Sequence, residues 1–129
     1  MGTRAVTKIE GLVNLYTHSD GYPSGYGMDL AEFLTGMTIT EGTSLSINAP
    51  ANLRLANGAG CLAAQMVAHF KKGPGTFYLV GDVHSGADYE YHVRVERQEI
   101  LVKVLAGETR QLFVGTVASF RKFCVEDDS

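Results

Sequence analysis

The segment from Asp88 to Glu96 constrains the fold most, because apolar and polar residues alternate along it without a break. Its apolar residues share one face of an extended chain and its polar residues share the other: Tyr89, Tyr91, Val93 and Val95 against Asp88, Glu90, His92, Arg94 and Glu96. A period of two predicts a strand with one buried and one exposed face. The same spacing continues at Ile100, Val102 and Val104, which predicts a second strand beside it.

Further segments supply the rest of the expected sheet. Thr3 to Ile9 and Leu12 to His18, separated by Glu10-Gly11, predict an N-terminal hairpin. The continuously apolar run from Thr76 to Gly81 predicts a central strand. Leu112 to Phe120 predicts a last strand and completes a C-terminal meander.

Two helices are expected between these groups of strands. Leu30, Phe33, Leu34 and Met37 form one apolar stripe at helical spacing, and a second helix is predicted from Cys61 to Lys72. The order ββααββββ predicts an α+β fold with a single, mainly antiparallel sheet and both helices on one face. We expect one domain over residues 1–125, an irregular connector from Thr38 to Ala51, and a frayed acidic tail over residues 126–129.

The other face of this sheet would carry charged and apolar side chains together. Solvent explains the charged residues and a subunit contact would explain the leucines: Glu90, His92, Arg94 and Lys103, with Leu101 and Leu105. Both interpretations stay open at this point.

Composition restricts the classes of partner. The 129 residues include eleven basic and fourteen acidic side chains, for a net charge of −3, so broad nucleic-acid binding is not expected. No apolar run approaches the roughly 20 residues of a membrane span, and Met1 to Glu10 lacks the apolar stretch of a signal peptide. With two cysteines, Cys61 and Cys124, we expect a reduced, cytoplasmic protein without a membrane partner.

The segment between the hairpin and the first helix is the strongest candidate for a site. It combines glycines with aromatic and polar residues: Tyr16, His18, Asp20, Tyr22, Ser24, Gly25 and Tyr26. Backbone N–H groups beside glycines can converge on an anion, and tyrosine rings can stack on a base or sugar. The alternative is a rigid turn whose tyrosines cap the edge of the core.

Residues at two other places in the chain could contact an anionic ligand. Arg4 should lie across the hairpin from the segment 16–18, where it could clamp a phosphate. Asn57, Gly58 and Gly60 precede the second helix and could offer free N–H groups. The alternatives are a solvated arginine and an ordinary helix cap. We predict no metal and no cofactor, because no metal-ligand spacing occurs and G-x-G-x-x-A at residues 58–63 lacks a second βαβ half.

Several sequence blocks occur in a fixed order, at residues 1–5, 20–27, 30–34, 57–58, 60–65, 67–70 and 89–91. With their MGTR start and DGYPSGxG loop, these blocks resemble a family of small uncharacterised proteins from tailed phages and prophages. The resemblance implies a phage accessory protein acting in the host cytoplasm. By analogy it implies an anti-defence protein that sequesters an immune signal such as a cyclic nucleotide or an ADP-ribose derivative.

The sequence therefore predicts a homo-oligomeric protein that binds a small phosphorylated or nucleotide-derived ligand, rather than an enzyme. One alternative is a protein–protein inhibitor of a host defence factor that docks through the outer sheet face or an edge strand. The other is a hydrolase of the nucleotide signal, with His18 as acid or base and Asp20 orienting it.

Overall fold

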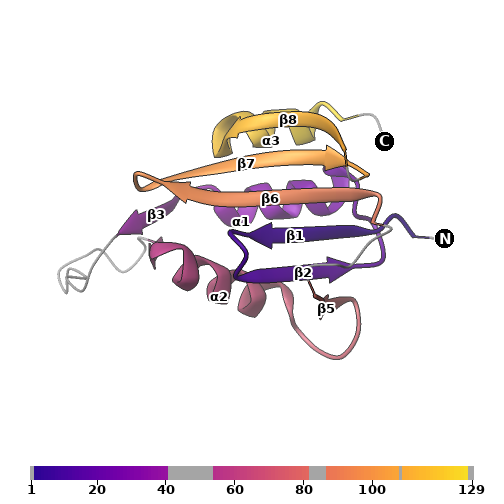
Figure 1. Ribbon diagram of the computed structural model, residues 1–129, viewed down its shortest axis with the longest axis horizontal. Coiled ribbons are helices and arrows are strands. Elements are labelled where there is room, and N and C mark those ends of the chain that lie inside the picture. Colours follow the sequence, from indigo (N-terminus) through magenta and orange to yellow (C-terminus); the bar gives the residue numbers. More distant parts are fainter. Residues whose placement is uncertain (1, 41–53, 82–86, 108, 128–129) are drawn as a thin grey trace.

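The computed structural model describes residues 2–40, 54–81, 87–107 and 109–127. Its main element is a six-stranded sheet in the order β5-β2-β1-β6-β7-β8 (Figure 1). The strands are β1 Ala5–Ile9, β2 Val13–Thr17, β5 Phe77–Leu79, β6 Tyr89–Glu96, β7 Glu99–Ala106 and β8 Arg110–Thr116. All neighbours pair antiparallel except β1 and β6, which are parallel. The predicted α+β class with a mainly antiparallel sheet is confirmed.

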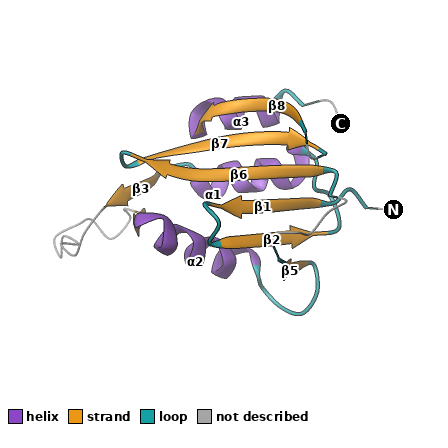
Figure 2. Cartoon of the chain, in the orientation of Figure 1, coloured by secondary structure: helices purple, strands orange, loops and turns teal. Residues whose placement is uncertain are grey.

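The described helices lie on one face of the sheet, and we call the other face, which none of them covers, the open face (Figure 2). They are α1 Met28–Leu34, α2 Gly58–Phe70 and α3 Val117–Val125, with a short π-helix, η1 Pro23–Gly27, directly before α1. A second, two-stranded parallel sheet pairs β3 Met37–Thr40 with β4 Arg54–Asn57. None of the helices in the described ranges is long and apolar enough to cross a membrane.

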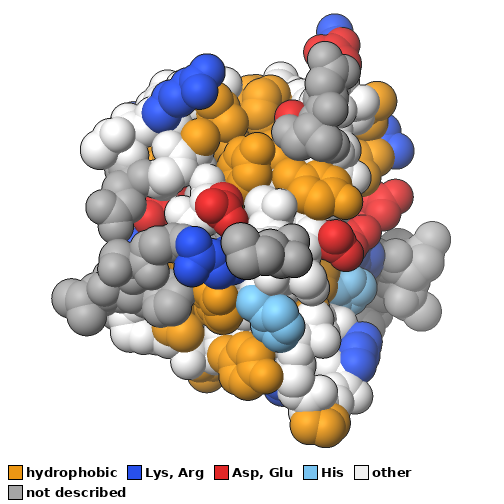
Figure 3. Space-filling view, turned by 90° about the vertical axis from the view of Figure 1, so that its right-hand side faces the viewer, with side chains coloured by type: hydrophobic (Ala, Val, Ile, Leu, Met, Phe, Trp, Pro, Cys, Tyr) orange, Lys and Arg blue, Asp and Glu red, His pale blue; other side chains and the backbone are white. Residues whose placement is uncertain are grey.

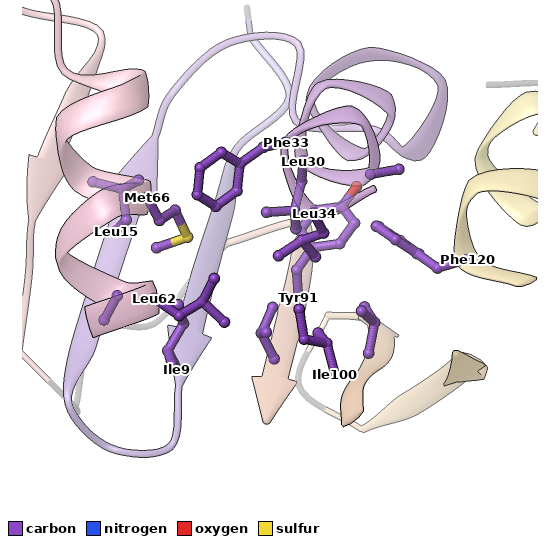
Figure 4. Close-up of a cluster of buried hydrophobic side chains, with 14 of the residues drawn as sticks. Ile9, Leu15, Leu30, Phe33, Leu34, Leu62, Met66, Tyr91, Ile100 and Phe120 are labelled. Carbon is purple, nitrogen blue, oxygen red and sulfur yellow. The ribbon is translucent and has the colours of Figure 1, made fainter. Parts of the chain in front are cut away.

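The core fills the space between the helices and the sheet. Leu30 of α1, Met66 of α2 and Phe120 of α3 are fully buried. Figure 4 shows these side chains converging from three helices on Ile9 and Tyr91 of the central strands. The inward face predicted for the segment 88–96 is therefore confirmed, and its polar residues face the open side.

The predicted strand from Leu112 to Phe120 is wrong in its second half. The chain leaves β8 at Thr116 and turns into α3, so the fold has three helices. The Thr116 hydroxyl accepts a hydrogen bond from the Ser119 N–H at 3.3 Å and caps the helix. Phe120 and Cys124, four residues apart, then face the core on one side of α3.

The order ββααββββ and the single sheet are also corrected. The predicted central strand at Thr76–Gly81 is the edge strand β5, where Leu79 is 64 % exposed, and β1 takes the place beside β6. Part of the expected connector, residues 38–40, belongs to β3, while residues 41–51 lie outside the described ranges. The parallel pair β1–β6 makes the sheet mixed, which the succession of strands along the chain did not indicate.

Candidate functional sites

The predicted loop is held by backbone hydrogen bonds at both ends. Asp20 has a φ of +56°, and its carbonyl oxygen accepts from the Tyr26 N–H at 2.7 Å. The Gly21 N–H donates to the Thr3 carbonyl oxygen at 2.9 Å, which ties the loop to the start of β1. The short helix η1 then leads straight into α1. The loop is thus a fixed connection across the end of the sheet.

Two buried tyrosine hydroxyls clamp this loop. The Tyr26 hydroxyl lies 2.6 Å from the Thr7 hydroxyl, and the Tyr91 hydroxyl donates to the Gly21 carbonyl oxygen at 2.7 Å. Burial raises the pKa of both phenols, so both act as neutral groups. Tyr26 is 4 % exposed, and its ring packs against Phe70 and Tyr91.

A hollow of about 370 Å³ lies beside the loop and gathers five of the predicted site residues: Asp20, Tyr22, Ser24, Gly25 and Tyr26. Its charged lining residues are the carboxylates of Asp20 and Asp29, and no lysine, arginine or histidine of the described residues lines it. Such a lining favours a neutral or cationic guest over an anion.

The remaining predicted residues near the hairpin lie outside this hollow. The Arg4 guanidinium Nε is 3.8 Å from Asp88 Oδ2, and the His18 ring lies 6.2 Å from the Tyr78 ring. Tyr16 pairs with Val6 and Tyr78 across the sheet. Seen from the end of the molecule where both termini lie, acidic and basic side chains are interspersed rather than gathered by sign (Figure 3).

Asn57, Gly58 and Gly60 lie at the opposite end of the sheet from the predicted loop, where α2 begins (Figure 1). Asn57 Oδ1 lies 3.5 Å from the Thr40 hydroxyl, and the Asn57 side chain does not cap the helix. Gly58 has a φ of +83°, the left-handed conformation that glycine adopts without strain. The structure therefore separates these three residues from the loop.

The open face of the sheet carries a larger hollow of about 530 Å³, which we call the sheet groove. It is lined by residues of β1, β2, β6, β7 and β8. Five lining residues form one row across these strands, because the register pairs Asn14 with Lys8, Lys8 with His92, His92 with Lys103, and Lys103 with Val114. We call these five residues the cross-strand row.

Cationic side chains outnumber anionic ones in the lining of the sheet groove. Lys8, Arg94 and Lys103 face a single carboxylate, that of Glu10. Glu10 Oε2 accepts from the Val95 N–H at 2.6 Å, and Arg94 pairs with Glu96 at 3.4 Å. Gln111 adds an amide, and Leu101 adds apolar surface.

A buried carboxylate supports the cross-strand row from beside it. One oxygen of Glu90, Oε1, lies 2.9 Å from His92 Nε2 and 3.7 Å from Lys8 Nζ. The Glu90 side chain is 10 % exposed, so this carboxylate is mostly desolvated. Lys103 is exposed, and no carboxylate among residues 2–40, 54–81, 87–107 and 109–127 lies within ion-pair distance of it.

Sequence reasoning placed His92, Arg94 and Lys103 on the outer sheet face but did not find the groove. Lys8 and Asn14 were missed, because they join the row only through the β1–β2 hairpin register and the parallel pairing of β1 with β6. Lys8, between Thr7 and Ile9 in a predicted strand, already had the period-two placement of an outward residue. The parallel partner of β1 had no local signal.

No metal centre is found in the described residues, and the state of the buried Cys124 thiol follows from its surroundings. No group of three or more His, Cys, Asp or Glu among them could hold a metal ion. Burial raises the pKa of the Cys124 thiol to about 12, which keeps it protonated at neutral pH.

Comparison with known proteins adds no assignment: no protein-family model, no curated protein and no solved structure matches the chain.

Proposed function

We propose that the protein binds a small organic phosphate of nucleotide size in the sheet groove. The observation that carries this proposal is the cross-strand row, in which Lys8 and Lys103 flank His92 inside a hollow of about 530 Å³. Neighbouring strands are about 4.8 Å apart, so the two lysines start about 10 Å from each other. Pockets of roughly 300–1,000 Å³ accommodate small molecules.

The chemistry of the groove fits both parts of a nucleotide. Ammonium groups bind phosphate, and the amide of Gln111 with the apolar surface of Leu101 and Val114 suits a base or sugar. The loop hollow has the opposite charge, which is why the groove is the better place for an anion. The resemblance to phage proteins is consistent with sequestration of such a ligand in a host cytoplasm.

Isothermal titration with adenosine 5′-monophosphate (AMP) tests the proposal. We expect binding that weakens with salt, and a Kd about five- to tenfold higher for Lys103→Gln, because one partly exposed charge contact is lost. Lys72→Gln, an exposed lysine beyond α2, is the matched control and should bind like the wild type. No heat at protein concentrations well above micromolar contradicts the proposal. Loss of binding in Tyr22→Ala but not in Lys103→Gln would move the site to the loop.

A second candidate function is docking on a protein partner through the edge strand β5. Tyr78 and Leu79 on this strand are 47 % and 64 % exposed, and an edge strand can pair with a strand of another protein. A Leu79→Lys variant should then lose capture of a host factor while its AMP titration is unchanged. Capture that survives this change would exclude β5 as the docking edge.

A further inference from the structure

His92 is the one member of the cross-strand row with an imidazole ring, a side chain that can carry a proton or lack one. Its side chain is 33 % exposed and lines the sheet groove, and its Nε2 contacts Glu90 Oε1. The inference that follows concerns the ligand class of this groove and rests on the function proposed above.

Charged groups surround His92 from every strand that packs beside it. Lys8 lies on β1, Lys103 lies on β7, and Glu90 and Arg94 lie on β6 itself. Glu10, at the end of β1, is turned to the backbone of Val95. The two lysines repel a positive charge on His92, while the Glu90 carboxylate, which also contacts Lys8, attracts one.

The net charge at the centre of the groove can be compared with the charge of the ligand. With a neutral imidazole, the two ammonium groups and the Glu90 carboxylate leave one net positive charge at the centre of the groove. That single charge matches a phosphodiester, which is a monoanion. A phosphate monoester is a dianion above its second pKa of about 6, and it needs one positive charge more. His92 can supply this charge by taking up a proton.

We propose that the sheet groove selects phosphate monoesters over phosphodiesters, and that it binds the monoester dianion together with a proton on His92. Lys8 and Lys103 contact the phosphate from either side, and the histidinium between them donates a further charge-assisted hydrogen bond. A phosphodiester gains nothing from the proton, so its binding leaves His92 unchanged.

AMP and adenosine 3′,5′-cyclic monophosphate (cyclic AMP) form a matched pair of probes, because they share base and sugar and differ in phosphate charge. Isothermal titration at pH 7.5, in two buffers of different ionisation enthalpy, measures the protons exchanged on binding. AMP already carries its two charges at this pH. We expect AMP to bind about fivefold more tightly than cyclic AMP, and to bind with net proton uptake that cyclic AMP lacks.

His92→Gln should abolish the proton uptake and lower the AMP affinity about fivefold, with little change for cyclic AMP. His69→Gln changes an exposed histidine of α2 that lies outside the groove lining, so this variant is the matched control and should behave like the wild type. Equal affinities without proton exchange, or uptake that persists in His92→Gln, overturn this inference while the proposed function stands. Absence of binding by both nucleotides overturns both.

Discussion

The loop at residues 19–27 and the open face of the sheet both carry polar residues of kinds that occur in binding sites, but the structure uses them differently. In the loop, tyrosine hydroxyls and backbone amides are bonded within the molecule, and Tyr26 is buried against Thr7. On the open face, Lys8, His92 and Lys103 line a hollow. The difference shows that residue types associated with binding mark a site only where their polar groups remain accessible.

The largest effect should come from breaking the loop. A Cβ atom at Gly21 would lie 2.7 Å from Ala5 Cβ and 3.0 Å from the Ala5 backbone nitrogen, closer than packed atoms allow. We expect Gly21→Ala to lower the free energy of unfolding by about 1–3 kcal/mol, measured by urea denaturation. Gly60→Ala is the control: its Cβ meets nothing within 4 Å and its helical position favours alanine. Equal stability of the two variants would show that the loop is not clamped.

The next effect tests the buried pair of hydroxyls. Tyr26→Phe leaves the Thr7 hydroxyl, which is 0 % exposed, without its partner, at an expected loss of about 1–2 kcal/mol. The double variant Tyr26→Phe with Thr7→Val removes both groups and should lose less than the sum of the single changes. Strict additivity in this double-mutant cycle, measured by urea denaturation, would contradict a direct bond.

The alternation of apolar and polar residues made the half-buried strand β6 and the hairpin predictable, because a strand with one buried face has an apolar residue at every second position. The position of β5 was not predictable in this way. Its residues Phe77 to Leu79 are apolar like those of a central strand, yet they lie at the edge of the sheet. An apolar run reports β-propensity but not which neighbours the strand acquires.

The candidate site was likewise predictable only in the part that depends on local sequence pattern. The outward placement of His92 and Lys103 followed from local alternation, whereas their alignment with Lys8 depends on β1 pairing parallel with β6, about eighty residues apart in the chain. In the loop, sequence could identify Tyr26 but could not show that its hydroxyl is bonded to Thr7. Long-range pairing, rather than residue type, decides which polar groups reach solvent.

A smaller effect concerns the acidic hollow beside the loop. Burial raises the pKa of Asp29, the charge of Glu32 acts in the same direction, and His69 opposes both. A raised pKa in the folded state means that stability falls as the pH rises through that value. Asp29→Asn should therefore stabilise the protein by less than about 1 kcal/mol at pH 7, because the exposed side chain is screened, and by nothing at pH 3. Urea midpoints at the two pH values measure this difference, and a destabilised variant at pH 7 would reverse the sign.

The smallest change in stability is expected for Lys103→Gln, and this variant tests the difference between the loop and the open face most directly. Lys103 is exposed and has no ion-pair partner among the described residues, so Lys103→Gln should leave the free energy of unfolding within about 0.5 kcal/mol of the wild type. A residue that contributes to binding but not to folding is expected where side chains remain available to a ligand. Urea denaturation and AMP titration of the same preparation therefore give opposite results for the two regions: Gly21→Ala changes stability, and Lys103→Gln changes affinity. A Lys103→Gln variant that is destabilised by more than about 1 kcal/mol would show that this lysine is engaged in the fold, and the open face would lose its distinction from the loop.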